Sequence, residues 1–277
     1  MNKIIQFHKI GQSHRFAGAG FGSNISIALN IINNLSTDDT VYIDMETVPC
    51  VCTEENFDRF NTSNCWEYYY DQISLPKGAE IISSLKTDFN KPNFDYRDVN
   101  LSDYSNLQYK FNKSFKLKDY IKEELELYYN NVLEGKQTLG VHIRLTDMAH
   151  HNNRYYNNKN PLDSYINKIK SILLENPNIN QIFIATDDSK VLPIIEKSFN
   201  IPVVYHNLYR ATNEKNHINP YERYEDGREF HKYQMGLECI KEIYTLSKCN
   251  YFLKAPVSAI SNTAVYLSTS INRLYKL

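Results

Sequence analysis

The second half of the chain alternates between short apolar runs and segments whose apolar residues recur every three or four positions. Short apolar runs are typical of buried strands, and the longer spacing is typical of amphipathic helices. The expected strands are 139–145, 181–185, 203–206 and 251–253, and the expected helices are 161–174, a segment after Asp188, 233–246 and 258–267. This alternation predicts a mostly parallel sheet with helices on both faces.

The first half opens with the same kind of unit. An apolar strand near Ile4 is followed by a glycine-rich turn at 18–23, a helix through 25–35 and a strand at 41–44. Such a turn lets a phosphate approach backbone N–H groups at a helix start, although a tight turn that only packs the helix is at least as common. The candidate binding residues of this turn are Gly20, Phe21 and Gly22.

The middle of the chain is the least regular part. Residues 86–118 are polar and show no clean period, so we expect loops and short elements there. A helix is expected over 119–133, and Glu134-Gly135 is typical of a helix end. We therefore predict an N-terminal α/β domain at 1–135 and a C-terminal domain at 136–277, a length sufficient for two domains.

Composition and charge narrow the classes of function. Lys and Arg number 31 against 32 Asp and Glu, and the formal charge is −1. Without a dense basic run, this balance argues against nucleic acid as a partner. The sequence shows no signal peptide and no apolar stretch long enough to span a bilayer. We expect a cytoplasmic protein without a transmembrane segment, which leaves peripheral membrane contact open.

Neither disulfides nor a metal site are expected. Five cysteines with no Cys-x-x-Cys pair favour reduced thiols. Cys50, Cys52 and Cys65 lie close in sequence, but no fourth ligand at a suitable spacing accompanies them. The acidic pair Asp44 and Glu46 lies far in sequence from the other candidates, so a metal-dependent mechanism is less attractive.

Polar side chains follow the predicted strands of the second half at their carboxyl ends, which is where open parallel sheets bind ligands. Arg144, Asp187, Asp188 and Ser258 are therefore expected to share one edge. Arg144 stands first among them, because a guanidinium matches a diphosphate and can neutralise charge on a departing nucleotide. An ion pair with Asp147 is the alternative interpretation of Arg144.

Each of the other edge residues has a structural alternative. Ser258 either adds donors for a phosphate or simply caps its helix. Asp188 caps the following helix or binds a ligand, and Asp187 accepts from ribose hydroxyls or orders the cleft. His142 shares a strand face with Arg144, and a hydrogen-bonded core histidine is its competing interpretation.

Three segments carry a family resemblance. The sequences "GVHIRLTD", "IFIATDD" and "EIYTLSKCNYFLKAPVSAIS", in this order, resemble the three motifs of α-1,6-fucosyltransferases, with protein O-fucosyltransferases as more distant relatives. The N-terminal "GAGFGSNISIALNIINNLSTDDTVYIDMET" resembles the glycine-rich first turn of that family. The resemblance is strongest over 139–266 and weak over 71–136.

The resemblance implies an α/β, GT-B-like fold of two Rossmann-like domains, with the donor site in the C-terminal parallel sheet and the acceptor side in the N-terminal domain. It also implies GDP-fucose as donor, inversion at the anomeric carbon, and no metal or other cofactor. By position, Arg144 matches the arginine that binds the donor diphosphate, and Glu242 falls where the family recognises guanine. A solvated helix face is the alternative for Glu242. The remaining matches are His142, the acidic pair Asp187 and Asp188, and Ser258 near the phosphates.

The sequence also departs from the family pattern. Leu145 replaces a second arginine, Met148 replaces a lysine, and Asn152 stands where the family has an acid. His150 and His151 are candidates for the catalytic base, or they are only residues of a loop.

The expected function is transfer of fucose from GDP-fucose to a hydroxyl of a glycan acceptor. The alternatives are a transferase for another GDP-sugar and a nucleotide-sugar-binding protein without turnover.

Overall fold

The computed structural model describes residues 2–6, 20–47, 50–54, 60–74, 77–83, 104–145, 161–210, 228–256 and 258–277. The chain divides into two compact units. Unit 1 comprises Met1–Glu124 and Tyr224–Ile240, and unit 2 comprises Leu125–Arg223 and Lys241–Leu277. Helices α3 (Asp119–Tyr128) and α7 (His231–Ser247) therefore contribute residues to both units.

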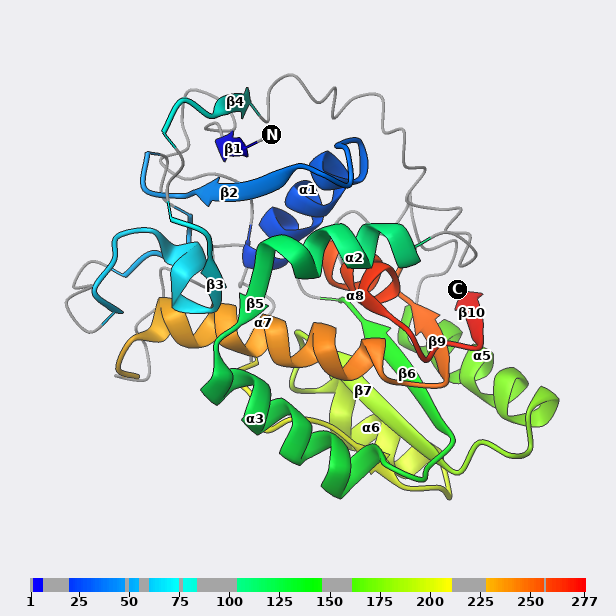
Figure 1. Cartoon of the computed structure of the whole chain (residues 1–277). Helices are drawn as coiled ribbons and strands as arrows, with labels where there is room; N and C mark the ends of the chain where they lie inside the picture. The colour runs from blue at the N-terminus through cyan, green and yellow to red at the C-terminus, as the bar shows by residue number, and fades with distance from the viewer. Residues whose placement is uncertain are drawn as a thin grey trace. The chain divides into compact units, whose positions relative to one another are not determined.

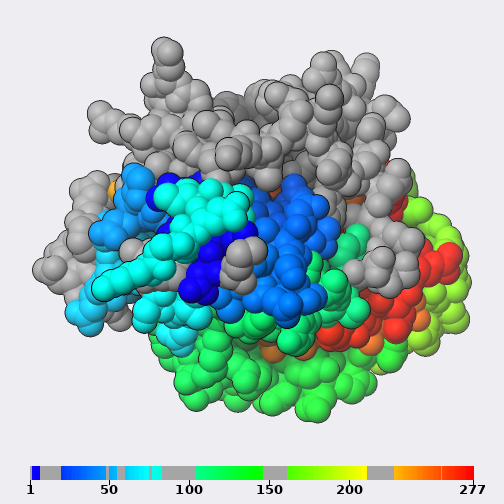
Figure 2. All heavy atoms as spheres, turned by 45° about the horizontal axis from the view of Figure 1, so that its top comes forward, coloured from blue at the N-terminus to red at the C-terminus, as the bar shows by residue number. Residues whose placement is uncertain are grey.

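Unit 1 contains a three-stranded parallel sheet in the order β2-β1-β4. Its strands are β1 (Asn2–Gln6), β2 (Thr40–Asp44) and β4 (Glu80–Ser83). The predicted strand, helix and strand at the start of the chain are confirmed, because α1 (Phe21–Asn33) joins β1 and β2. Figure 2 shows residues of α1 and β2 in blue beside those of β4 in cyan on one continuous surface.

Short elements complete unit 1. Strands β3 (Tyr70–Gln72) and β5 (Phe115–Leu117) pair antiparallel, and a 3-10 helix, η2 (Cys65–Tyr68), precedes β3. Helix α2 (Ser105–Ser114) lies within the polar stretch for which the sequence predicts only loops and short elements. Its buried face includes Lys110, whose ammonium donates to the carbonyls of Asn33 and Leu35. Because a lysine occupies one of the buried positions, the apolar residues alone do not show the helical period of α2.

The predicted helix over 119–133 is confirmed with one irregularity. α3 runs to Tyr128 and continues as a π-helical turn, η5 (Tyr129–Leu133). The Glu134 N–H donates to the Tyr129 carbonyl over 2.9 Å, which is the wider spacing of a π-helix. The extra residue places Leu133 in the core, and Val132, which the spacing predicts as buried, is half-exposed. Gly135, at φ +73, ends the helix as predicted.

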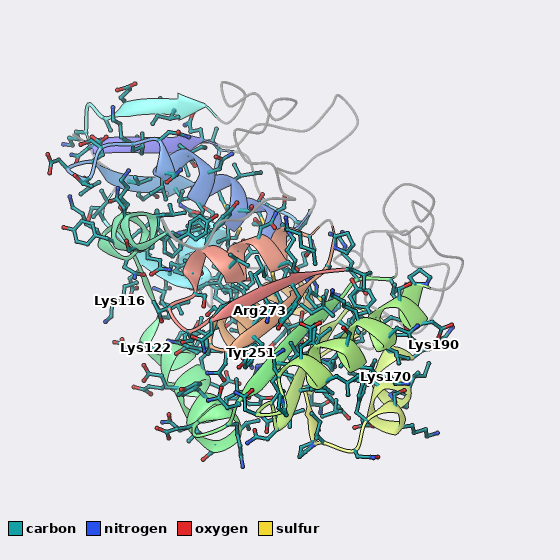
Figure 3. The ribbon with its side chains drawn as sticks, turned by 90° about the vertical axis from the view of Figure 1, so that its right-hand side faces the viewer. Lys116, Lys122, Lys170, Lys190, Tyr251 and Arg273 are labelled. Carbon is teal, nitrogen blue, oxygen red and sulfur yellow. The ribbon has the colours of Figure 1, made fainter. Side chains whose placement is uncertain are left out.

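Unit 2 is built on a five-stranded parallel sheet in the order β10-β9-β6-β7-β8 (Figure 1). Its strands are β6 (Thr138–Ile143), β7 (Gln181–Thr186), β8 (Val203–Val204), β9 (Tyr251–Lys254) and β10 (Arg273–Lys276). The sequence predicts the first four, and β10 is an addition at the edge, where Arg273 pairs in register with Tyr251 (Figure 3). The predicted parallel sheet is confirmed.

Helices cover both faces of this sheet (Figure 1). α5 (Pro161–Glu175) and α6 (Val191–Ser198) pack on one face, where Tyr165, Ile169 and Ile195 join the strand residues in a fully buried core. The end of α7 packs on the other face, because a Cβ at Gly140 would lie 3.2 Å from Leu246. α8 (Ala259–Leu267) contacts that same face through His142. No helix in the described ranges is long and apolar enough to cross a bilayer.

Candidate functional site

The register of the central strands sets the geometry of the candidate site. β6 and β7 pair so that Ile143 lies opposite Thr186, which places Arg144 and Asp187 at the same carboxyl edge. Both side chains are half-buried. The Leu145 N–H donates to Asp187 Oδ1 over 3.0 Å, so this carboxylate orders the backbone that follows β6. Of the two roles considered for Asp187, this contact favours ordering of the cleft.

His142 lies at the centre of a buried polar network on the α8 side of the sheet. Its side chain is 2% exposed, and Nδ1 lies 2.8 Å from Ser261 Oγ and 3.1 Å from Ser258 Oγ. The Ala255 N–H donates to Ser261 Oγ over 3.1 Å, which holds this hydroxyl beside Nδ1. Through these contacts, His142 joins β6 to the start of α8.

Ser258 is the N-cap residue of α8. Its side chain accepts from the Ser261 N–H over 3.3 Å, so the helix-cap interpretation is confirmed. The residue is 4% exposed, and its hydroxyl also faces His142. A helix N-terminus carries partial positive charge at this point, next to the end of β9. The contact between Ser258 and a phosphate stays a prediction.

The charge state of His142 follows from its surroundings. Burial, and secondarily the guanidinium of Arg144, lowers the pKa of His142 to about 3. The imidazole is therefore neutral at physiological pH, and it adds no charge to the edge occupied by Arg144. Its hydrogen bonds are those of a core histidine, which favours the structural interpretation given above as the alternative.

This charge state predicts a pH dependence of stability. Between the ordinary histidine pKa of 6.5 and the value of about 3 in the fold, an unfolded chain binds a proton at His142 that the folded chain does not. The free energy of unfolding should therefore fall as the pH is lowered through this window, by up to about 1.4 kcal/mol per pH unit for one such group. We expect His142→Asn, whose amide hydrogen-bonds in either direction but does not titrate in this range, to lessen that slope.

Urea denaturation of wild type and His142→Asn at several pH values between 7 and 4 measures this slope. His206 is present in both proteins and serves as the internal reference, since burial lowers its pKa to about 4. Parallel slopes for the two proteins would contradict the assignment of a neutral, buried His142.

Asp188 and Glu242 occupy different environments. Asp188 Oδ1 accepts from the Lys190 N–H over 2.9 Å in the turn that leads into α6, but the N-cap of that helix is Lys190, so the two roles of Asp188 stay predictions. Glu242 is 9% exposed, so the interpretation of this residue as part of a solvated helix face is wrong. Its Oε1 lies 4.0 Å from Nη2 of Arg210. The spacing of residues along α7 could not predict that Glu242 is buried beside an arginine, because Arg210 lies in a loop outside that helix.

Arg210 connects the ends of two neighbouring strands. It donates from Nε to the Thr186 carbonyl over 3.1 Å and from Nη2 to the His206 carbonyl over 2.8 Å. The Arg210 side chain is buried and fixes the carboxyl ends of β7 and β8.

Lys254 is a candidate that the sequence reasoning missed. It ends β9, is 2% exposed, and donates from Nζ to Asn262 Oδ1 over 3.4 Å. Within the described residues, Asn262 Nδ2 and Thr263 Oγ1 are buried without a hydrogen-bond partner. The sequence signal for Lys254 was a lysine at the end of an otherwise apolar strand. In the structure, Leu253 pairs with Val141, which places Lys254 level with His142.

The remaining candidates lie elsewhere. Gly20 is the N-cap of α1 in unit 1, and its carbonyl accepts from the N–H groups of Ser23 and Asn24. Phe21 is fully buried against Trp66 and Tyr69, and Gly22 is buried beside it in the first turn of α1. Their binding of phosphate stays a prediction. The residues His150, His151, Met148 and Asn152 lie outside the described residues.

His, Cys, Asp and Glu side chains, the usual metal ligands, occur throughout the described ranges. There, no group of three or more His, Cys, Asp or Glu side chains is placed to hold a metal ion. The five cysteines are free and buried. Asp44 accepts from Thr47 and Gln6, and these bonds fix the turn after β2.

Comparison with known proteins identifies the fold. No protein-family model matches the sequence, and no curated protein is similar enough to it to be matched. Among solved structures, NodZ α-1,6-fucosyltransferase co-crystallised with GDP matches with a TM-score of 0.58 at 15% identity, covering 100% of this chain and 94% of that one. The fucosyltransferase NodZ from Bradyrhizobium matches with a TM-score of 0.57 at 16% identity, covering 99% and 94%.

A third structure, NodZ soaked with GDP-fucose, matches with a TM-score of 0.55 at 16% identity and covers 96% of this chain and 92% of the other. These matches extend over nearly the whole length of both proteins. They confirm, at the level of fold, the resemblance seen in the three motifs. The chain therefore has the α/β, GT-B-like fold of the NodZ α-1,6-fucosyltransferases.

Proposed function

We propose that this protein is a glycosyltransferase that moves L-fucose from GDP-fucose to a hydroxyl of a glycan acceptor. The observation that carries the proposal is the position of Arg144, at the carboxyl edge of the sheet of unit 2 and close enough to His142 to lower its pKa. Fold similarity to proteins that were crystallised with GDP and soaked with GDP-fucose supports it.

The chemistry that this edge would perform is stabilisation of a leaving group. As the acceptor oxygen bonds to the anomeric carbon, the bond to the diphosphate breaks and negative charge develops on GDP. Arg144 offers two parallel donors to that charge, and the N-terminus of α8 favours it further. His142 holds Ser258 and α8 in place without adding a proton at neutral pH.

The acceptor attacks from the face opposite the diphosphate, which inverts the anomeric carbon. Its hydroxyl proton passes to a base, for which the sequence offers His150 and His151. Glu242 is proposed to recognise guanine, because a carboxylate can accept from both N1–H and the 2-amino group. Its burial beside Arg210 strengthens such hydrogen bonds. We propose that the reaction needs no metal.

A second candidate function follows from Leu145. The family has an arginine at this position, whereas the Leu145 side chain packs against the buried core of the sheet. The edge therefore lacks one of the cations that would balance the leaving group. A protein that binds a nucleotide sugar without turning it over would retain Arg144 and lose such a second cation.

An assay of nucleoside diphosphate release, GDP from the GDP-sugars and UDP from UDP-galactose, distinguishes the candidates. The protein is incubated with GDP-fucose, GDP-mannose or UDP-galactose, with and without a panel of oligosaccharides, in the presence of EDTA. We expect release of GDP from GDP-fucose that rises when an acceptor is added, together with a product heavier by one deoxyhexose. Turnover of GDP-mannose alone would mean another donor, and GDP binding without release from any donor would favour the binding protein.

A further inference from the structure

Unit 1 contains a pocket that the donor site does not use. Its volume is about 320 Å³. The pocket lies among η2, β2, β3 and the residue after β5, and six of its lining residues carry the argument: Tyr42, Phe60, Glu67, Asp71, Gln72 and Lys118. We call it the Glu67 pocket.

Glu67 is held at the centre of a hydrogen-bond network. Its Oε1 accepts from Gln72 Nε2 over 3.0 Å and from the Tyr42 hydroxyl over 3.3 Å. Its Oε2 accepts from the Thr62 hydroxyl over 2.7 Å. A carboxylate has about four acceptor positions, so the half-buried Glu67 keeps capacity for a further donor. The network fixes the orientation of this carboxylate before any ligand arrives.

Gln72 is fixed by the backbone as well. Its Oε1 accepts from the Ile43 N–H over 2.9 Å, and its Nε2 donates to the Ile43 carbonyl over 3.1 Å. These two bonds attach the side chain to β2 as an extra strand residue would. The polar wall of the Glu67 pocket is therefore rigid, which lowers the entropic cost of binding.

An aromatic ring forms another wall. Phe60 stacks on Tyr68 with ring centroids 4.2 Å apart at 26°, and it also contacts the ring of Tyr233 at 4.8 Å. The ring is held from these sides while Phe60 itself stays half-exposed at the pocket. The C–H face of a pyranose packs on such a ring, and its hydroxyls reach outward to polar groups.

The rim supplies a cation and a second carboxylate. Lys118 donates to Asp71 Oδ1 over 2.6 Å, and the two side chains are 31% and 51% exposed. The antiparallel pairing of Tyr70 with Leu117 brings these neighbours together. Two carboxylates against one ammonium disfavour a phosphate, and the polar walls disfavour an apolar ligand.

We infer that the Glu67 pocket binds one neutral pyranose ring of an oligosaccharide. Its volume is at the small end of the roughly 300–1,000 Å³ typical of ligand pockets, which suits a single sugar. Fixed carboxylate and amide groups pair with hydroxyls, and Phe60 covers the apolar face of the ring. The assignment of the pocket to a sugar of the acceptor rests on the proposed function. The inference that the pocket binds a saccharide does not depend on that function.

Saturation-transfer NMR on the full chain tests this inference. The probes are the methyl glycosides of glucose, galactose, mannose and N-acetylglucosamine, with cellobiose and lactose. We expect ring-proton signals from at least one of them, and affinity reduced about tenfold or more by Glu67→Gln and by Phe60→Ala. The matched controls Glu123→Gln and Tyr109→Ala change exposed residues outside the pocket and should bind like wild type.

GDP binding, measured on the same samples, separates this inference from the proposed function. Saccharide binding that needs Glu67, in a protein that does not bind GDP, supports the pocket and overturns the donor site. GDP binding with no signal from any probe, or with equal signals from Glu67→Gln and wild type, overturns the pocket alone. If Phe60→Ala does not fold, Lys118→Gln at the exposed rim provides the second variant, with the same expected loss.

Discussion

Replacing Arg144 with alanine is expected to weaken GDP binding by about 30-fold, which corresponds to about 2 kcal/mol. The guanidinium lies at the edge where α8 begins, and a diphosphate placed there would lose its bidentate, charge-assisted partner. Asp187 holds the backbone just after Arg144 through Leu145 N–H, so the substitution should leave the strand itself in place. Loss of binding would then report the missing charge.

Calorimetric titration of GDP into wild type and variants, without added metal, measures this effect. Arg273→Ala is the matched control, because this arginine lies on the edge strand β10 and its side chain is 58% exposed, 3.8 Å from Glu175. The GDP affinity of Arg144→Lys should fall between those of wild type and Arg144→Ala, since lysine keeps the charge but lacks the planar fork of donors. Equal affinity of wild type and Arg144→Ala would remove Arg144 from the donor site.

Gly236→Ala should lower the stability of unit 1 by about 2–3 kcal/mol. Gly236 lies in α7, and an added Cβ would overlap the Tyr69 hydroxyl and lie 2.6 Å from its Cζ. Tyr69 has no room to move, because it is fully buried, stacks on Tyr233 at 5.4 Å, and donates to the Tyr233 carbonyl over 3.0 Å. The clash outweighs the gain of up to about 1 kcal/mol that alanine brings to a helix.

The urea midpoint of denaturation tests this, with Tyr69→Phe as the partner substitution. Removing the hydroxyl oxygen takes away the atom that the new methyl overlaps, so the double variant should be more stable than the sum of the two single effects predicts. Strict additivity of the two substitutions, or an unchanged midpoint for Gly236→Ala, would show that α7 and Tyr69 do not meet as described.

The sequence pattern predicted the elements that bury the most apolar surface. The sequence predicts β6, β7 and β9 because β6 and β7 are buried along their whole length and β9 along most of it. Helices such as α5 are predictable because they bury one clear apolar stripe. Short edge elements gave little signal. β10 mixes charged and apolar residues over only four positions, and β3 and β5 have three each, so pairing with partners distant in sequence decides their conformation.

The candidate site was predictable in part for the same reason. Register in a parallel sheet brings strand ends together, and so it placed His142, Arg144 and Asp187 near one another. The buried partners of Glu242 and Lys254 were not predictable, because Arg210 and Asn262 reach them from a loop and a helix. The Glu67 pocket gave no motif at all, since its walls come from segments between Tyr42 and Lys118.

Unit 1 is built from two segments that lie far apart in the sequence, and this affects how it folds during synthesis on the ribosome. Tyr69 and its hydrogen-bond partner Tyr233 are 164 residues apart, and Glu54 accepts from the Tyr233 N–H. The buried stack around Tyr69 stays open until Tyr224–Ile240 has been synthesised. Until that segment has been made, a nascent chain exposes the aromatic side chains that Tyr233 covers in the folded unit.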